Sequence, residues 1–204
     1  MSKRGQEREI KLYVLHLDRL QTRLRDLQAR LSQPRVLETN LRFDLPDGSL
    51  RAAGRVLRLR RDTEARLTYK GAGLNDRGIL DRQEIEFVVD NFEMARKFLE
   101  ALGYQQSMVY EKYRTTYEME NVAVMLDELP YGKFVEIEGE TNEQIQATAQ
   151  KLHLDQSAAI NNSYTGLFEN IRKALELPFQ DLTFENFKDL QISADQLGTR
   201  VADK

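Results

Sequence analysis

The stretch Phe134-Val135-Glu136-Ile137-Glu138 has acidic residues at 136 and 138 and apolar residues at 135 and 137. Successive side chains of a β-strand point to opposite faces, so this stretch predicts a strand with one charged face and one apolar face. The segment Glu7-Arg8-Glu9-Ile10-Lys11-Leu12 repeats the pattern near the start of the chain, with charged residues at 7, 9 and 11. The fold is therefore expected to depend on strands that are charged on one side and apolar on the other.

Alternating runs of this kind predict eight strands, separated by turn-forming segments such as Pro46-Asp47-Gly48-Ser49 and Pro130-Tyr131-Gly132. The strands are expected at residues 7–15, 36–45, 55–62, 65–71, 82–90, 107–118, 121–129 and 133–140. Helices are expected over 17–32, about 92–102, from 141 to about 152, and over 163–176. The stretch 179–204 is expected to be a short amphipathic tail that packs against the body and frays beyond about residue 194.

Composition excludes several classes of protein. The chain has 204 residues and no cysteine, which excludes disulfide frameworks, thiolate metal sites and cysteine nucleophiles. Only His16 and His153 are present, so a site with several histidine ligands is excluded as well. The formal net charge of −3 lacks the basic excess of a general nucleic-acid binder. No apolar run approaches the length of a membrane span, and the first residues lead into no apolar segment, so a cytoplasmic protein with no nucleic-acid or membrane partner is expected.

One face of the predicted strands carries six cations and seven carboxylates. The cations are Lys11, Arg58, Arg60, Lys70, Lys112 and Arg114. The carboxylates are Glu7, Glu9, Glu84, Glu86, Asp127, Glu136 and Glu138. A sheet whose charged face simply meets water is the alternative interpretation, since charged residues are mostly exposed. However, Glu and Lys have poor strand propensity, and like charges two residues apart repel one another.

A closed barrel accounts for this charged face better than an open sheet does. A dry interior would not tolerate so many charges, so the interior should be polar, with helices covering the apolar outer face. The fold class is therefore predicted as α+β, an eight-stranded antiparallel β-barrel with helices packed outside. Its acidic and basic walls suit divalent cations bound to a polyanion, because carboxylates bind hard cations and Lys and Arg bind phosphate oxygens.

The ordered set of charged motifs resembles the CYTH superfamily, also called triphosphate tunnel metalloenzymes, which includes class IV adenylate cyclases, thiamine triphosphatases and inorganic triphosphatases. Residues 7–11 fit its Glu-x-Glu-x-Lys signature. Further blocks follow in family order: Arg58-Leu59-Arg60, Leu67-Thr68-Tyr69-Lys70-Gly71, Arg82-Gln83-Glu84-Ile85-Glu86, Lys112-Tyr113-Arg114, Leu126-Asp127-Glu128 and residues 134–138. Leu102-Gly103-Tyr104 and Asn162-Ser163-Tyr164 resemble the cyclase-like branch. The resemblance covers about residues 6–175, so a tunnel domain is expected over 1–176, with 177–204 as a tail and not a separate domain.

The resemblance implies a tunnel, open at both ends, that binds a triphosphate together with two Mg²⁺ or Mn²⁺ ions. The residues that resemble the metal ligands are Glu7, Glu9, Asp127, Glu136 and Glu138. The residues that resemble the phosphate-binding cations are Lys11, Arg58, Arg60, Lys70, Lys112 and Arg114. Lys11, Glu9 and Glu138 are the candidate catalytic residues, and Glu84 and Glu86 match an additional acidic pair. Leu41-Arg42-Phe43-Asp44 replaces a more aromatic family block, which leaves the specificity for the end of the substrate open.

Two reactions and one binding role fit such a tunnel. Water attacking the terminal phosphorus would make the protein a triphosphatase, whereas a ribose 3′-hydroxyl attacking the α-phosphorus would make it an adenylate cyclase. No adenine-reading motif is visible, so hydrolysis of an inorganic or organic triphosphate is favoured. A non-catalytic polyphosphate- or nucleotide-binding module is the third possibility. In each case the partner is a small-molecule triphosphate, and the protein is a monomer or a homodimer.

Overall fold

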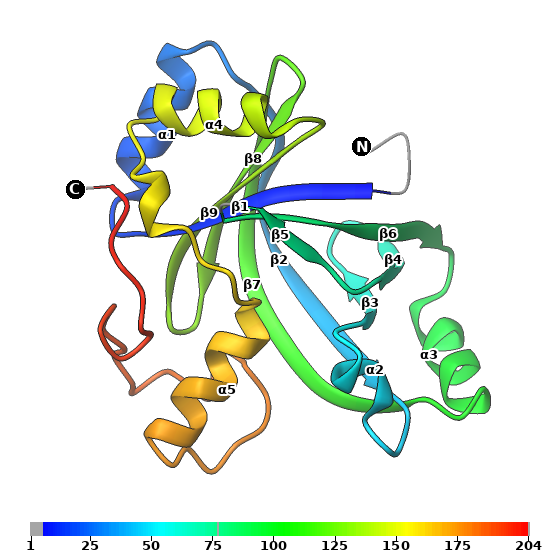
Figure 1. The fold of residues 1–204 in the computed structure, drawn as a ribbon. Helices are drawn as coiled ribbons and strands as arrows, with labels where there is room; N and C mark the ends of the chain where they lie inside the picture. Colours follow the sequence, from blue (N-terminus) through cyan, green and yellow to red (C-terminus); the bar gives the residue numbers. More distant parts are fainter. Residues whose placement is uncertain (1–5, 77, 204) are drawn as a thin grey trace.

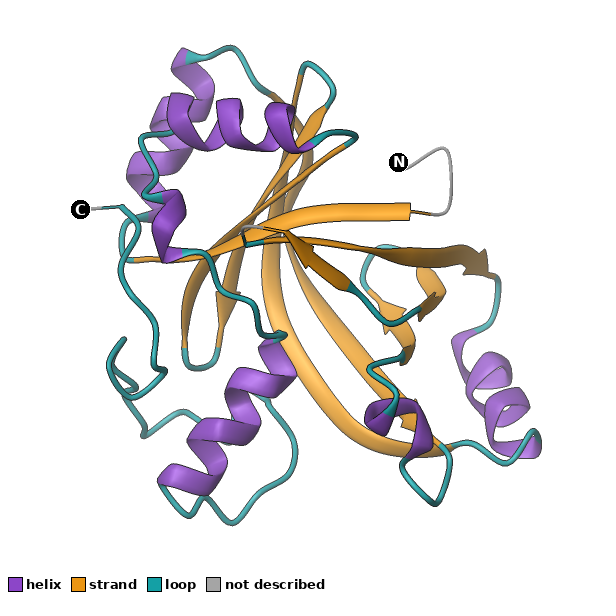
Figure 2. Ribbon diagram, in the orientation of Figure 1, coloured by secondary structure: helices purple, strands orange, loops and turns teal. Residues whose placement is uncertain are grey.

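A computed structural model describes residues 6–76 and 78–203. Its strands are β1 (Gln6–Val14), β2 (Arg30–Asp44), β3 (Val56–Arg61), β4 (Ala65–Lys70), β5 (Leu74–Asp76), β6 (Ile79–Val89), β7 (Gln105–Met119), β8 (Val122–Leu129) and β9 (Gly132–Gly139). Eight of them pair antiparallel in the order β1-β9-β8-β7-β2-β3-β4-β6, and pairing of β6 with β1 closes the barrel (Figures 1 and 2). The predicted fold, an α+β protein with an eight-stranded antiparallel barrel, is confirmed. The short β5, which was not predicted, pairs with β6 alone.

Helices cover two parts of the outer face of the barrel. α1 (Leu17–Asp26) and α4 (Asn142–Lys151) lie over β1, β8 and β9 (Figure 2). There Leu12, Leu24, Ile137 and Ile145 are fully buried in one apolar cluster. On the other side, α3 (Phe92–Ala101) packs through Leu99 on the outer residues of β2 and β3. The alternation of each strand thus sends its apolar residues outward, under the helices, and its charged residues inward.

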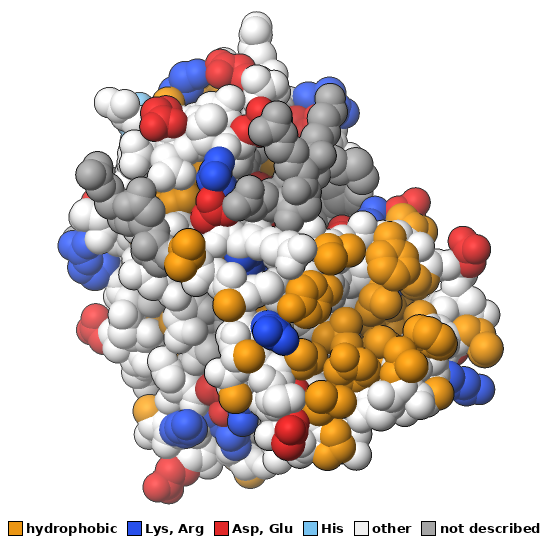
Figure 3. Space-filling view, turned by 45° about the vertical axis from the view of Figure 1, so that its right-hand side comes forward, with side chains coloured by type: hydrophobic (Ala, Val, Ile, Leu, Met, Phe, Trp, Pro, Cys, Tyr) orange, Lys and Arg blue, Asp and Glu red, His pale blue; other side chains and the backbone are white. Residues whose placement is uncertain are grey.

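Part of the outer face is left uncovered, which differs from the expectation that helices would cover it. Ile85 and Phe87 on β6 are 49% and 53% exposed, and Phe98 on α3 is 61% exposed. Figure 3 shows apolar side chains gathered on this side of the molecule. α3 leaves them exposed because its buried contact, Leu99, is directed toward β2 and β3.

The predicted helix over 17–32 is wrong in its second half. α1 ends at Asp26, Gln28 has a left-handed φ of 59°, and β2 begins at Arg30. The segment after Arg30 pairs with β7, with register irregularities on either side of Gln33, close to Pro34. Pro34 has no N–H to donate, so it interrupts the ladder. The helical spacing of Leu31 is therefore coincidental, because pairing with β7 outweighs it. A short helix, α2 (Ser49–Ala52), and a 3₁₀ turn at Gln156–Ala158 were also not predicted.

Aromatic side chains fill one end of the barrel interior. Tyr13 and Phe134 are inward-facing partners on β1 and β9, and their rings lie 5.3 Å apart. Tyr164, at the start of α5 (Tyr164–Ala174), packs edge-on against Phe134. Tyr131, Phe168 and Phe187 extend this cluster. Aromatic rings therefore surround the interior at this end, and the opening of the tunnel at both ends stays a prediction.

The chain after α5 returns to the barrel. Leu182 and Phe187 are buried in the aromatic cluster. The main-chain N–H of Ala202 donates to the Tyr13 carbonyl at 2.9 Å, and the Asp203 carboxylate accepts the N–H groups of Leu15 and His16. Fraying beyond about residue 194 is thus not observed, because the last described residues pair with the end of β1. Within the described ranges, no helix is long and apolar enough to cross a membrane.

Candidate active site

The charged residues singled out from the sequence converge inside the barrel. Glu9 and Glu138 are directly opposed in the register of β1 and β9, as are Lys11 and Glu136. Lys11 lies 3.1 Å from Glu136 and 3.7 Å from Glu9. The same parity that sends Ile137 into the apolar cluster outside sends these side chains inward. Their burial excludes the alternative of an open sheet whose charged face meets water, since Glu9, Lys11 and Glu136 are each less than 10% exposed.

One wall of the interior is basic and is formed by β3 and β4. Arg58 donates to the Tyr110 hydroxyl at 3.2 Å, the Thr68 hydroxyl at 3.1 Å and the Glu86 carboxylate at 3.3 Å. Arg60 lies 3.2 Å from Glu86 and 3.5 Å from Glu38. These contacts hold both guanidinium groups in fixed positions, which suits the recognition of phosphate oxygens.

β7 and β8 add a second group of cations, organised by Asp127. This carboxylate is fully buried and accepts hydrogen bonds from Lys112 at 3.1 Å, from Arg114 through two nitrogens, and from the Tyr164 hydroxyl at 2.8 Å. Arg114 also pairs with Glu136. Both oxygens of Asp127 are thus already engaged. Its predicted role as a metal ligand stays a prediction, because both oxygens of Glu7 and of Glu136 are engaged by cations in the same way.

The remaining carboxylates form an acidic group around β1, β6 and β9. Glu7 pairs with Lys70 and with Arg82 at 2.9 Å, and these cations lower its pKa to about 2 against the opposing effect of burial. Glu84 lies 3.4 Å from Lys70. Glu138 has no ion pair among the described residues. Burial, together with the carboxylates of Glu7, Glu84 and Glu9, raises the pKa of Glu138 to about 7.

The acidic group fits a hard divalent cation in its chemistry. Burial and the neighbouring carboxylates of Glu136 and Glu7 raise the pKa of Glu9, which lies directly opposite Glu138, whose pKa is raised as well. All donors are carboxylate oxygens, which Mg²⁺ and Mn²⁺ prefer. In the part of the chain that the structure describes, no three acidic or histidine side chains are already arranged as a metal centre. Glu7, Glu9 and Glu136 lie in contact with Lys or Arg instead.

The sequence analysis did not single out several interior residues, among them Glu38, Arg42, Arg82 and Tyr110. Glu38 is 2% exposed and lies 3.6 Å from Lys112; the surrounding cations lower its pKa to about 2 although burial opposes this. The signal was present in the parity of the strands. Glu38 and Arg42 share one face of β2, Arg82 shares a face with Glu84, and Tyr110 shares a face with Lys112.

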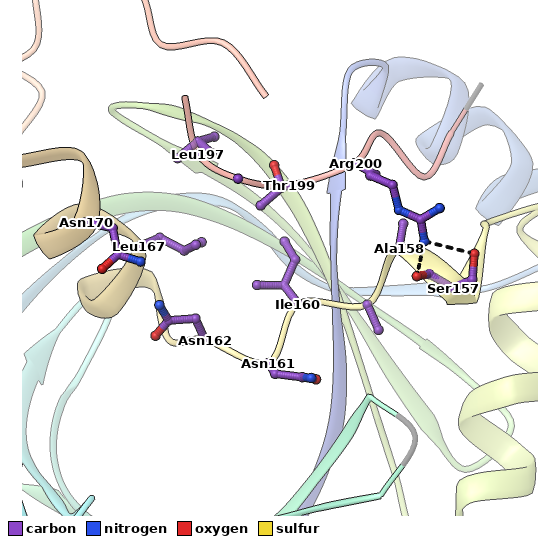
Figure 4. Close-up of a pocket in the computed structure, with 12 residues that line it drawn as sticks. Ser157, Ala158, Ile160, Asn161, Asn162, Leu167, Asn170, Leu197, Thr199 and Arg200 are labelled. Carbon is purple, nitrogen blue, oxygen red and sulfur yellow. Dashed lines mark hydrogen bonds between the residues drawn. The ribbon is translucent and has the colours of Figure 1, made fainter. Parts of the chain in front are cut away.

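A separate cavity of about 420 Å³ lies outside this charged network, between the segment 157–162, α5 and the chain at 197–200 (Figure 4). Asn162, Asn170 and Thr199 contribute polar groups to its lining. Arg200 donates to the carbonyl and to the hydroxyl of Ser157, which joins two of its sides. A smaller cavity shares the residues 160–162 with it and reaches Glu9, Lys11 and Arg82.

Comparison with known proteins agrees with this geometry. The family model of the CYTH domain matches residues 5–164. A proposed adenylate cyclase from Vibrio parahaemolyticus is similar in structure, with a TM-score of 0.74 and 21% identity over 81% of this chain and 99% of that one. The PH1819 protein from Pyrococcus horikoshii has a TM-score of 0.63 and 25% identity over 80% and 98% of the two chains. A proposed adenylyl cyclase from Hippeastrum, reported to have a dominant triphosphatase activity, has a TM-score of 0.59 and 18% identity over 80% and 95%. The search of curated proteins found no match.

Proposed function

The chain belongs to the CYTH domain family, and we propose that it is a Mg²⁺- or Mn²⁺-dependent hydrolase that cleaves a phosphoanhydride bond of a triphosphate bound inside the barrel. One observation carries the proposal: the cations of β3, β4 and β7 and the carboxylates of β1 and β9 point into the same interior. A triphosphate would bind between the two groups, exchanging ion pairs within the protein for ion pairs with its own oxygens.

The cations have a binding and charge-neutralising role in this proposal. Lys11, Arg58, Arg60, Lys70, Lys112 and Arg114 would contact phosphate oxygens and stabilise the charge that develops on the leaving pyrophosphate. Each is held by at least one carboxylate before substrate binds, so little reorganisation is needed.

The acidic group would hold the metal and handle the proton. Glu7, Glu9, Glu136 and Glu138 are the residues that would bind Mg²⁺ or Mn²⁺, which supplies charge neutralisation and a more acidic attacking water. Water attacks the terminal phosphorus, the bond from that phosphorus to the bridging oxygen breaks, and one proton of the water passes to a carboxylate. Glu138 is our candidate for this acceptor, because it has no ion pair among the described residues and lies directly opposite Glu9 in the acidic group.

A protein with the same fold is reported to hydrolyse triphosphate, which supports the choice of hydrolysis. The Hippeastrum protein, reported as a triphosphatase in its dominant activity, shares the fold. The interior of our protein is charged along β3, β4 and β7, which suits a phosphate chain.

Product analysis by phosphorus NMR tests the proposal. Inorganic triphosphate, ATP and thiamine triphosphate are each incubated with the protein and Mg²⁺ or Mn²⁺. We expect phosphate and a product shortened by one phosphate. Cyclic AMP and pyrophosphate from ATP would instead make the protein an adenylate cyclase, and tight binding without any product would make it a binding module.

A further inference from the structure

Two arginines stand side by side inside the barrel. Arg42 on β2 is directly opposite Arg58 on β3 in the antiparallel register. Directly opposed side chains have Cβ atoms about 4.5–5.5 Å apart, and like charges in this position repel each other. On its other side, Arg42 is paired in register with Met108 of β7, which carries no charge.

Arg42 has no carboxylate partner among the described residues, unlike the six cations singled out from the sequence. Arg58 pairs with Glu86 at 3.3 Å, but the one side-chain hydrogen bond of Arg42 goes to the Thr165 hydroxyl at 3.3 Å. Its Nε is shielded from solvent and makes no hydrogen bond. Asp44, on the same face of β2, instead accepts the main-chain N–H of Leu45 and those of Leu50 and Arg51 in α2. Burial and the nearby charges of Arg58 and Arg82 lower the pKa of Arg42, which agrees with the absence of a carboxylate partner among the described residues.

The first turn of α5 lies beside the Arg42 guanidinium. Ser163 caps this helix, accepting the N–H of Gly166 at 3.0 Å, and Thr165 follows in the first turn. The first N–H groups of a helix have no partner within it, and the N-terminal end carries partial positive charge. The helix end thus adds to the positive potential around Arg42 and leaves donors that suit an anion.

We propose that Arg42, with Arg58 and the first turn of α5, forms a subsite for an anionic group at the end of the ligand, and that this subsite makes the barrel selective for an inorganic phosphate chain over a nucleoside triphosphate. The inference rests on the proposed function only in that it places the ligand in the same interior. An inorganic chain presents charged oxygens along its whole length. A neutral ribose or base in this subsite would leave a buried guanidinium uncompensated, which disfavours the nucleotide.

Calorimetric titration tests the subsite without turnover. Inorganic triphosphate and ATP are titrated, in EDTA and at constant ionic strength, into the unmutated protein and into Arg42→Gln, Arg42→Lys and Arg55→Gln. Arg55 is an exposed arginine before β3 and serves as the matched control. We expect Arg42→Gln to weaken triphosphate binding at least tenfold and ATP binding less than threefold. Arg42→Lys should recover most of the loss, and Arg55→Gln should change neither affinity.

The melting temperature of the ligand-free variants gives a second readout. Arg42→Gln should melt at the same temperature as the unmutated protein or higher, because the repulsion from Arg58 is removed; a large drop would mean that Arg42 is needed for packing and would overturn the subsite. Equal losses for triphosphate and ATP, or no loss for either, would overturn the selectivity. Failure of the proposed function would look different. In that case triphosphate would still bind in an Arg42-dependent manner, but addition of Mg²⁺ or Mn²⁺ would lead to no release of phosphate.

Discussion

Glu9 and Glu138 are directly opposed on neighbouring strands in the barrel interior, and the pKa of each is raised. The next inward-facing pair along the same strands, Lys11 and Glu136, is oppositely charged and in contact at 3.1 Å. The two pairs differ in what they require. The second is compensated within the protein, whereas the first gains stability from a proton or from a cation. Several predictions about pH, metal and ligand depend on this difference.

We predict that the metal-free protein loses stability as the pH rises through the range in which Glu138 loses its proton. Its pKa is about 7 in the folded protein and near 4.5 in the unfolded chain, so the folded state binds the proton more tightly. The associated stability is present below pH 4.5 and is lost as pH rises toward 7 and above. Glu138→Gln should therefore be more stable than the unmutated protein at pH 8 by about 1–3 kcal/mol, with a smaller difference at pH 5. Thermal denaturation in EDTA at both pH values measures this, and an unchanged difference between them would contradict the assignment.

Metal should reverse that effect and should be required for turnover. Mg²⁺ or Mn²⁺ added at pH 8 should raise the melting temperature of the unmutated protein, because a ligand that binds only the folded state stabilises it. The rise should be reduced in Glu9→Gln and Glu138→Gln, which should also lose most turnover. Ca²⁺ should inhibit, since its longer and looser coordination displaces the attacking oxygen. Full turnover in EDTA would rule out the metal dependence.

Asp127→Asn should destabilise the fold more than Glu138→Gln does. Asp127 is the buried partner of Lys112 and Arg114, and removing its charge leaves both cations without their main carboxylate. The expected cost is about 3–5 kcal/mol of unfolding free energy. Tyr164→Phe, which removes only the hydroxyl bonded to Asp127 at 2.8 Å, should cost about 1.5–3 kcal/mol. Urea denaturation in EDTA measures both variants. If Asp127→Asn kept full stability and lost only metal binding, Asp127 would be a metal ligand instead.

Two isoleucines on the outer face provide a matched pair. Ile137 is fully buried under α1 and α4, whereas Ile85 on β6 is 49% exposed. Ile137→Asp should unfold the protein or cost more than about 4 kcal/mol, because it buries an unpaired charge. Ile85→Asp should cost less than about 1 kcal/mol, as an exposed substitution does. Circular dichroism during urea denaturation compares them. Similar costs for the two would show that the outer face near Ile85 is covered in solution.

The basic wall should bind triphosphate through several cations at once. Arg58→Ala and Lys112→Ala should each weaken the binding of inorganic triphosphate by about 1–3 kcal/mol, as expected for charge-assisted hydrogen bonds. The loss should be smaller for pyrophosphate, which has fewer charged oxygens. Lys97→Ala, at an exposed position on α3, is the control. Calorimetry in EDTA measures the affinities. Unchanged triphosphate binding in both variants would contradict the hypothesis that these cations form one binding site.

The strand faces of this protein are readable from its sequence alone. Glu136 and Glu138 lie inward and Val135 and Ile137 lie outward because a strand alternates its side chains at every residue, whatever it pairs with. Eight such runs, each with one charged and one apolar face, predicted a barrel with a polar interior and helices outside, and the structure has this architecture apart from the exposed apolar residues of β6. The same rule applied to β2 would have included Glu38 and Arg42.

Contacts between residues distant in sequence were decided only by the tertiary structure. Leu31 has helical spacing, yet it lies on β2, because pairing with β7 supplies ladder hydrogen bonds that local propensity cannot offset. Nothing in the sequence around Asp127 indicates that Tyr164, 37 residues later, donates to it and occupies one of its oxygens. Barrel closure also sets Arg42 against Arg58 and Glu9 against Glu138, since register depends on which strands meet. The sequence alone thus determined which side chains face inward. The closed barrel determined which of these charged side chains form ion pairs within the protein and which do not.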